Sequence, residues 1–285
     1  MLKILVTGGN GQLARCIKVI SSKYLDTHTF SYKSSAELNI TNKAAVLREF
    51  ESGAYDYCIN TAAFTNVDGA EKDKDLADLV NRQGAKNLAE ASNIYNVVLV
   101  HISTDFVFDG AQSVPYTEKD PTNALGSYGS SKLKGEQAIS LICQKYFIIR
   151  TSWLYSEFGS NFLKSMLKYG RERNELSVVF DQIGTPTYAM DLAEVLVLFL
   201  KPNKVDYGIY HYSNEGVASW YDFAKAIFEI NGISVHLQPI RSDAYPLPAK
   251  RPSFSVLDKS KIKKALQIEI PYWRDSLIKA SKALK

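Results

Sequence analysis

Short apolar runs alternate with longer stretches of helical periodicity in the first half of the chain. The apolar runs with strand character cover residues 4–7, 29–32, 57–60, 97–103 and 147–151. Between them, apolar residues recur at helical spacing over 13–22, 43–51, 73–93 and 130–143. Strands separated by helices of this length predict an α/β fold, in which a doubly wound parallel sheet carries helices on both faces. Such a sheet binds ligands at the carboxyl ends of its strands.

The second half of the chain has a less regular pattern. Helical stretches persist over 188–200, 220–231 and 273–284, but Pro and Gly interrupt the segments between them. We therefore expect a sheet domain over 1–150, to which 175–215 contributes in part. Residues 151–174 and 216–285 would form a smaller α/β region that holds the substrate.

Composition adds few constraints. The 34 Lys and Arg nearly balance the 30 Asp and Glu, so the net charge of +4 gives little reason to expect a nucleic acid partner. Cys16, Cys58 and Cys143 are far apart in apolar stretches, as is typical of core thiols in a reducing compartment. The chain shows no signal-peptide pattern and no apolar run near the ~18 residues that span a bilayer. We expect a cytoplasmic protein without a membrane partner.

A glycine-rich loop follows the first predicted strand. It reads Thr7-Gly8-Gly9-Asn10-Gly11-Gln12-Leu13-Ala14 and leads directly into a helical pattern. Gly8 can take the tight turn, and Gly11 lets the backbone approach a pyrophosphate bound at the helix N-terminus. Glycine also serves tight turns for steric reasons alone. The placement between a strand and a helix favours dinucleotide binding, which makes 1–150 a Rossmann-type NAD(P)-binding domain.

The second predicted strand ends without the acidic residue that binds the ribose 2′-hydroxyl in NAD-selective proteins. The segment reads Ser31-Tyr32-Lys33-Ser34-Ser35. Lys33 and the neighbouring hydroxyls could accept the 2′-phosphate of NADP, and a solvated turn lysine is an equally good interpretation. We expect NADPH as the cofactor, with NADH as an alternative that the site could accept.

Tyr128 and Lys132 are four residues apart at the start of a predicted helix, so their side chains project from one face. A tyrosine hydroxyl has a pKa near ~10, and an adjacent ammonium favours the phenolate and brings the group into the range of acid–base chemistry. Such a pair also arises by chance on helices. The evidence for a catalytic role therefore depends on the residues at the neighbouring strand ends.

The residues at two of these strand ends are compatible with a cofactor bound nearby. Thr104 follows the fourth predicted strand and could donate a hydrogen bond to a substrate carbonyl oxygen, although it could equally cap a turn. Asp105 fits turn capping better than a substrate contact. Ala62 and Ala63 follow the third strand, where small side chains let the backbone lie against a cofactor or simply pack closely.

These segments together resemble the dTDP-4-dehydrorhamnose reductase family of extended short-chain dehydrogenases. The likeness runs nearly end to end, through residues 8–14, 60–71, 103–110, 128–136, 150–155, 181–187, 251–252 and 273–274. The Tyr and Lys motif belongs to the whole superfamily. The Arg-Thr-Ser-Trp and Asp-Gln-x-Gly-x-Pro-Thr segments are specific to this branch.

The resemblance implies that hydride passes from NADPH to C4 of dTDP-4-dehydro-β-L-rhamnose. It makes Tyr128 the proton donor, Lys132 the group that tunes it, and Thr104 the group that polarises the carbonyl. The implied cofactor contacts are Gly8, Gly11, Gln12, Leu13, Lys33, Asn39, Ile40, Ala62, Ala63, Thr65, Tyr128 and Lys132. The implied substrate contacts are Thr104, Asp105, Phe106, Tyr128, Trp153 and Arg251.

The last two substrate contacts have structural alternatives. Trp153 would be a wall of the substrate pocket, or else an ordinary core tryptophan. Arg251 would bind the nucleotide diphosphate through two hydrogen bonds, or else form a surface ion pair.

Some residues depart from the family pattern. Phe64 stands where His is common, Ala14 where Gly is common, and Asn39 where Asp is common. Arg15 lies near the position of an acidic Mg²⁺ ligand of some relatives, so we expect no metal. Relatives often form homodimers, and a homodimer is the oligomer that the resemblance suggests.

Two other functions stay open. The same chemistry could act on another nucleotide-linked 4-keto-6-deoxysugar. The chain also resembles the β subunit of methionine adenosyltransferase, which is a non-catalytic regulatory subunit, but Thr104, Tyr128 and Lys132 together weigh against that role.

Overall fold

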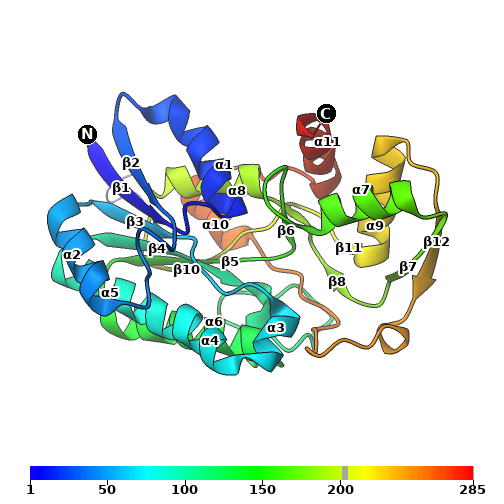
Figure 1. Ribbon diagram of the computed structural model, residues 1–285, viewed down its shortest axis with the longest axis horizontal. Coiled ribbons are helices and arrows are strands. Elements are labelled where there is room, and N and C mark those ends of the chain that lie inside the picture. The colour runs from blue at the N-terminus through cyan, green and yellow to red at the C-terminus, as the bar shows by residue number, and fades with distance from the viewer. Residues whose placement is uncertain (201–204, 285) are drawn as a thin grey trace.

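The computed structural model describes residues 1–200 and 205–284, so the parts of the expected domains at 201–204 and 285 lie outside the described residues. A six-stranded sheet forms the centre of the larger region (Figure 1). Its order is β2 (His28–Lys33), β1 (Leu2–Thr7), β3 (Tyr57–Asn60), β4 (Val98–Thr104), β5 (Tyr146–Thr151) and β10 (Gly208–His211), with every pairing parallel. The order reverses between β1 and β3, which is where such sheets bind ligands. The doubly wound parallel sheet expected from the sequence is confirmed.

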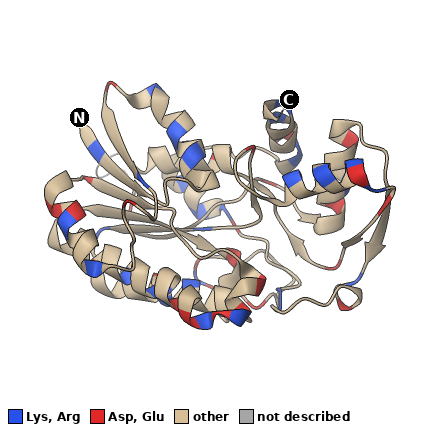
Figure 2. Cartoon of the chain, in the orientation of Figure 1, with Lys and Arg blue, Asp and Glu red and all other residues tan. Residues whose placement is uncertain are grey.

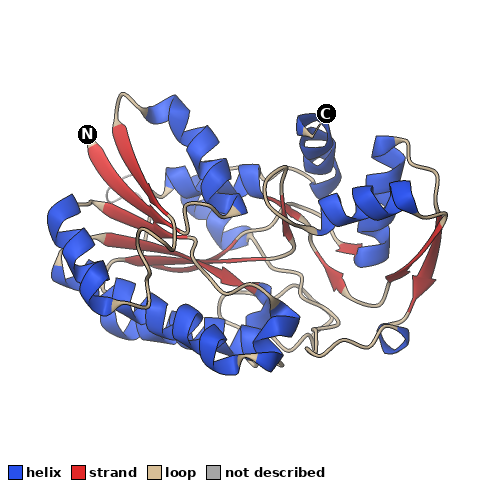
Figure 3. Ribbon diagram, viewed as in Figure 1, coloured by secondary structure: helices blue, strands red, loops and turns tan. Residues whose placement is uncertain are grey.

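Helices cover both faces of this sheet (Figure 3). On one face lie α1 (Gln12–Ser21), α8 (Ala189–Leu198) and α10 (Ser260–Leu266), and on the other lie α2 (Lys43–Gly53), α5 (Ala85–Ile94) and α6 (Ser127–Ile142). Side chains of β1 alternate between the layers, with Ile4 and Val6 in the first core and Leu5 in the second. This explains the continuous apolar runs, because a strand covered on both faces needs apolar residues at every position.

The helix expected over 73–93 is present, but it is not α-helical throughout. After α3 (Val67–Lys72), the chain forms α4 (Lys74–Asp78), a π-helical turn η2 (Leu79–Gly84) and then α5. The π-helical turn contains Asn81, whose side chain accepts a hydrogen bond from the Phe64 N–H and donates to the Phe64 carbonyl. Asn81 also donates to the Ser131 hydroxyl of α6. The wider turn therefore joins the loop after β3 to the helix that carries Tyr128.

A second region lies beside the sheet (Figure 1). Its core is formed by α7 (Phe162–Glu172), α9 (Trp220–Asn231) and α11 (Trp273–Ala283), together with a parallel pair of β7 (Glu175–Val179) and β12 (His236–Ile240). Two short pairs complete it: β6 (Leu154–Tyr155) with β9 (Thr187–Tyr188), and β8 (Ile183–Gly184) with β11 (Ala218–Ser219). Short 3-10 turns occur at Ser22–Tyr24, Asp105–Val107 and Ser242–Ala244.

The chain passes between the two regions more than once. Elements α8 and β10 belong to the sheet core, while β7, in the same expected segment 175–215, packs in the second core. Ile262 and Ile270 return to the sheet core late in the chain. The expected domain boundaries stay a prediction, because both regions draw on interleaved segments.

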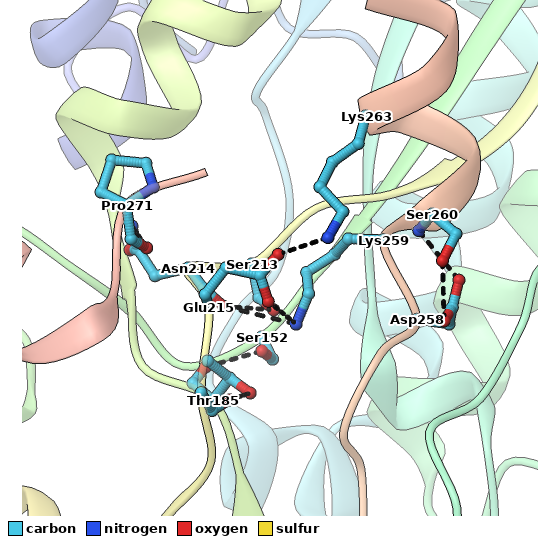
Figure 4. A network of polar contacts seen from close by, with 11 residues as sticks. Ser152, Thr185, Ser213, Asn214, Glu215, Asp258, Lys259, Ser260, Lys263 and Pro271 are labelled. Carbon is cyan, nitrogen blue, oxygen red and sulfur yellow. Dashed lines mark hydrogen bonds and ion pairs between the residues drawn. The ribbon is translucent and has the colours of Figure 1, made fainter. Parts of the chain in front are cut away.

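A polar joint connects these interleaved segments (Figure 4). Asn214 follows β10, accepts a hydrogen bond from the Tyr188 N–H at 2.7 Å and donates to the Pro271 carbonyl at 3.2 Å. The adjacent Glu215 carboxylate binds Lys263 at 2.8 Å and the buried Lys259 at 3.4 Å. The joint ties α10 and the approach to α11 to the end of β10.

Charged residues of both signs are intermixed along the outer helices (Figure 2). Among the residues that the structure describes, none of the helices has the length and apolar character that crossing a membrane requires.

Candidate active site

The glycine-rich loop lies at the point where the strand order reverses. Gly8 has a φ of +68°, and a Cβ there would lie 2.8 Å from backbone atoms of Ala62. The Gly11 N–H donates to the Gly8 carbonyl at 2.8 Å, which closes the turn. Gly11 also precedes α1, whose first turn has no side-chain cap. Backbone N–H groups of that turn can therefore bind an anionic pyrophosphate.

The side chains of Gln12 and Leu13 have structural partners. Leu13 is buried in the sheet core. The Gln12 amide donates to the Leu154 carbonyl at 3.1 Å and accepts from Ser156 and Asn161 at 3.1 and 3.3 Å. This leaves the backbone of both residues for a cofactor. Gln12 also links the cofactor loop to the second region.

Lys33 lies beside the glycine-rich loop at the end of β2. Its carbonyl accepts the Gly9 N–H at 2.8 Å, and its Nζ lies 3.4 Å from Glu49 Oε1 of α2. Asn39 and Ile40 follow in a turn, in which the Asn39 side chain accepts from Thr41. Ile40 is buried against Gly84, and its carbonyl accepts from Asn87.

The backbone after β3 is held from two sides. The Ala62 N–H donates to Asn60 Oδ1 at 3.1 Å, and Asn81 binds both backbone groups of Phe64. Ala62 and Ala63 are partly exposed and Thr65 is exposed, so this segment forms an accessible edge next to the glycine-rich loop.

Thr104, Phe106 and Tyr128 come together at the carboxyl end of β4. The Thr104 hydroxyl donates to Asp105 Oδ1 at 3.1 Å and accepts the Phe106 N–H at 3.2 Å. The Phe106 and Tyr128 rings meet edge to face with centroids 5.7 Å apart. Burial raises the pKa of Tyr128 to about 12, and a hydrogen bond from Thr104 opposes this shift. Tyr128 is therefore a neutral phenol at neutral pH.

The Lys132 amino group points toward β4. Its Nζ donates to the Ile102 carbonyl at 2.5 Å and lies 3.2 Å from His101 Nε2. Burial lowers the pKa of Lys132 to about 8, and Glu136 opposes this shift. Burial is the largest cause of the raised pKa of Tyr128, and the role of Lys132 in tuning that pKa stays a prediction.

The sequence did not predict two buried polar residues of this site, His101 and Asn60. His101 is 1% exposed, and its Nδ1 lies 2.8 Å from Asn60 Nδ2. Asn60 Oδ1 in turn accepts from the Thr7 hydroxyl at 2.7 Å. In the sequence, His101 is the one ionisable residue in the apolar run that ends at Ser103, and this pattern could have marked it as a candidate. The sequence does not show that Asn60 is its partner.

Glu71 of α3 is a further residue that spacing did not reveal. Its carboxylate accepts from the Ser127 N–H at 2.6 Å and from the Ser127 hydroxyl at 3.0 Å. Because Gly126 offers no side-chain cap, Glu71 caps the helix that carries Tyr128.

Asp105 is almost fully buried beside Thr104. Its Oδ2 has no hydrogen-bond partner among the described residues. Burial raises the pKa of Asp105 to about 6, although hydrogen bonds from Ser255 and Thr104 oppose the shift.

Trp153 follows β5, and Arg251 lies in the loop that precedes α10. Trp153 has a φ of +46° and stacks on Trp220, with 3.6 Å between ring centroids. Arg251 forms a two-pronged ion pair with Asp68 of α3, with N···O distances of 2.8 and 3.3 Å. The ion pair that was the alternative interpretation of Arg251 is thus present, and a diphosphate would have to compete with Asp68.

Known proteins that are similar to this chain match it over nearly its full length. The model of the RmlD substrate binding domain family matches residues 2–285. The dTDP-4-dehydrorhamnose reductase of Aggregatibacter actinomycetemcomitans is 39% identical, with 97% of each chain covered. The spore coat polysaccharide biosynthesis protein SpsK of Bacillus subtilis is 41% identical, covering 97% of this chain and 96% of its own. A crystal structure of dTDP-4-dehydrorhamnose reductase from Bacillus anthracis, in complex with NADP, has a TM-score of 0.95 at 36% identity and covers 99% of this chain and 100% of that chain.

Proposed function

The chain belongs to the RmlD substrate binding domain family, and from this membership we propose that it reduces the C4 keto group of dTDP-4-dehydro-β-L-rhamnose to give dTDP-L-rhamnose. The proposed cofactor is NADPH, since the relative from Bacillus anthracis was solved with NADP. The observation that carries the proposal is the meeting of Thr104, Phe106 and Tyr128 at the carboxyl end of β4, in a chain that the family model matches over 2–285.

The loop after β1 fits a dinucleotide. The uncapped first turn of α1 offers N–H groups to the pyrophosphate, and Gly8 could carry no side chain without meeting Ala62. We assign the remaining cofactor contacts to Lys33, Asn39 and Ile40, to the segment 62–65, and to Tyr128 and Lys132. Bound NADPH would supply a hydride to the carbonyl carbon of the substrate.

The protein residues supply the proton. A phenol whose pKa is raised to about 12 keeps its proton at neutral pH and can give it to the more basic alkoxide oxygen that the reduction creates. The Tyr128 O–H bond breaks, an O–H bond forms on the sugar, and solvent returns a proton to the phenolate. Thr104 would orient the carbonyl oxygen next to Tyr128.

We assign the sugar nucleotide to the neighbourhood of Thr104 and Tyr128, on the side where Arg251 of the second region meets Asp68 of the sheet domain. Phe106 and Trp153 would contact the sugar and Arg251 the diphosphate, with Asp105 holding Thr104 in place. Arg251 would exchange Asp68 for phosphate oxygens, which offer the same two-pronged geometry.

The test is NADPH oxidation with enzymatically generated dTDP-4-dehydro-L-rhamnose, followed by identification of the sugar. Tyr128→Phe should still bind NADPH and lose at least ~100-fold in kcat, the usual contribution of a general acid. Tyr272→Phe is the control, since Tyr272 is 45% exposed and lies outside the proposed site. NADPH binding without turnover would contradict the substrate assignment, and other nucleotide-linked 4-keto-6-deoxysugars would then be assayed.

A further inference from the structure

The helix that carries Tyr128 begins without a cap of its own. α6 starts at Ser127, and the preceding Gly126 offers no side chain to the free N–H groups of the first turn. Glu71 of α3 supplies the acceptor instead. One of its carboxylate oxygens accepts the Ser127 N–H at 2.6 Å, and the other accepts the Ser127 hydroxyl at 3.0 Å. Both oxygens of Glu71 therefore hold the residue directly before Tyr128.

Gly126 is the residue that allows this close approach. A Cβ at Gly126 would lie 2.8 Å from a carboxylate oxygen of Glu71, so a side chain there would displace the carboxylate. Ser, Thr, Asp and Asn are the residues that usually cap a helix from this position. The chain has glycine instead, and the cap of α6 comes from another element.

The helix that carries Glu71 is itself anchored. The side chain of Asn66 caps α3 at its start. Asp68 lies three residues before Glu71, on the same side of α3, and accepts a hydrogen bond from Arg251 at 2.8 Å. α3 also follows directly on the segment 62–65, which we assign to the cofactor site. The position of Glu71 is therefore set by the edge of the cofactor site and by the loop that carries Arg251.

The other contacts at the start of α6 involve residues beyond Tyr128. Gly129 packs so closely on the 3-10 turn after β4 that a Cβ there would overlap a carbonyl group. Ser131 accepts a hydrogen bond from Asn81 at 3.0 Å. Since helices fray from their ends, loss of the cap would free the part of α6 that contains Tyr128 while these later contacts hold the rest.

We propose that Glu71 is a positioning residue, which caps α6 and thereby holds the Tyr128 hydroxyl where the sugar oxygen receives its proton. The catalytic consequence rests on the proposed reductase function. Proton transfer needs donor and acceptor atoms about 2.6–3.2 Å apart, so fraying of this turn removes the required geometry. Lys132 lies one turn further along and stays bound to the Ile102 carbonyl, so the cofactor site is retained. Glu71 therefore acts on kcat rather than on binding.

The kinetic experiment compares two substitutions of Glu71. Glu71→Ala removes the cap and should lower kcat for the sugar at least ~10-fold, since a displacement of ~1 Å can cost ~100-fold, with a much smaller change in KM and in the Kd of NADPH. Glu71→Gln should restore most of kcat, because its amide oxygen accepts the Ser127 N–H and its amide nitrogen donates to the Ser127 hydroxyl. Equal losses of kcat in both variants would contradict the proposal, since charge rather than position would then matter.

A second readout needs no substrate. NMR of the full chain labelled with ¹³Cζ-tyrosine has 17 signals to resolve, and Tyr128→Phe assigns the relevant one. The Tyr128 signal should shift in Glu71→Ala and return in Glu71→Gln. A signal that stays fixed in Glu71→Ala, or a shifted signal with an unchanged kcat, would overturn the proposal. If the wild type reduces no sugar, the reductase assignment fails, and this signal still tests whether Glu71 positions Tyr128.

The matched control removes a cap from a helix without assigned site residues. Asn42 caps α2 by accepting the Ala45 N–H at 3.1 Å. Asn42→Ala should lose a stability comparable to that lost by Glu71→Ala, and it should leave kcat and the Tyr128 signal unchanged. An equal loss of kcat in Asn42→Ala would show a general effect of lowered stability and reject the positioning role. If Glu71→Ala does not fold, Glu71→Asp, which is one methylene shorter, provides the same test with a smaller loss of kcat.

Discussion

The indole rings of Trp153 and Trp220 stack with their centroids 3.6 Å apart and their planes 8° from parallel. Gly184 lies against this pair, because a Cβ there would be 2.7 Å from the Trp153 ring. The stack therefore holds Trp153 in its left-handed backbone conformation, with α9 as its support.

Trp220→Ala should weaken binding of the nucleotide sugar through Trp153. We expect KM to rise about 3- to 10-fold with a smaller change in kcat, in keeping with the ~0.5–1.5 kcal/mol of an aromatic pair. Trp220→Phe keeps an aromatic face and should lie close to the wild type. An unchanged KM in Trp220→Ala would argue that Trp153 is a core residue rather than a pocket wall.

Lys33→Ala should discriminate between the two cofactors. The 2′-phosphate is the group that distinguishes NADPH from NADH, and a charge-assisted hydrogen bond is worth ~1.5–3 kcal/mol, so we expect KM for NADPH to rise at least about 10-fold. KM for NADH should change little. Lys23→Ala is a matched control, since Lys23 forms an exposed ion pair with Glu194. Equal changes for both cofactors would identify Lys33 as a structural partner of Glu49 alone.

Gly8→Ala should lower the free energy of unfolding by more than the strain of a left-handed φ alone. Gly232 has nearly the same φ, +65°, but its Cβ would meet nothing within 4 Å, whereas that of Gly8 would meet Ala62. We expect Gly232→Ala to lower the free energy of unfolding by ~1–2 kcal/mol and Gly8→Ala to exceed that value. Denaturant unfolding measures both. Equal losses would show that the loop moves away from Ala62 easily.

Glu136→Gln should be strongly destabilising. Both side chains of the Arg150 and Glu136 pair are 3% exposed, and removing one charge leaves the other buried, at a cost of ~3–5 kcal/mol. Glu229→Gln removes the matching partner of Arg274, in a pair whose side chains are 42% and 47% exposed, and should cost less than ~1 kcal/mol. The unfolding midpoints in urea compare the two, and similar shifts would contradict the buried-charge argument.

Asp68→Asn should remove part of the acid sensitivity of the protein. The Arg251 guanidinium holds the pKa of Asp68 below its ordinary value, so the folded state binds a proton less readily than the unfolded state. The stabilisation is complete above the ordinary aspartate pKa of ~3.9 and is lost as pH falls through the lower folded value. Thermal unfolding of Asp68→Asn should therefore vary less with pH below ~4 than that of the wild type. Parallel curves would mean that the ion pair contributes nothing to stability.

The sequence by itself determined the sheet, the nucleotide loop and the helix that carries Tyr128. These features depend on local patterns: apolar periodicity decides which faces are covered, glycine decides where the chain can turn, and a spacing of four residues puts Tyr128 and Lys132 on one face. A local pattern does not reveal the irregularity at Leu79–Gly84, because that turn is wound to fit Phe64 and Ser131 from other segments.

Only the tertiary structure decided which partner each charged or polar side chain has. Lys33 lies next to Glu49, Arg251 next to Asp68, and Lys132 next to His101. Each partner is at least 16 residues away and comes from another element, so its identity depends on how sheet and helices pack. Burial, which that packing creates, then raises the pKa of Tyr128 and lowers that of Lys132, since removing water penalises the charged form of each group.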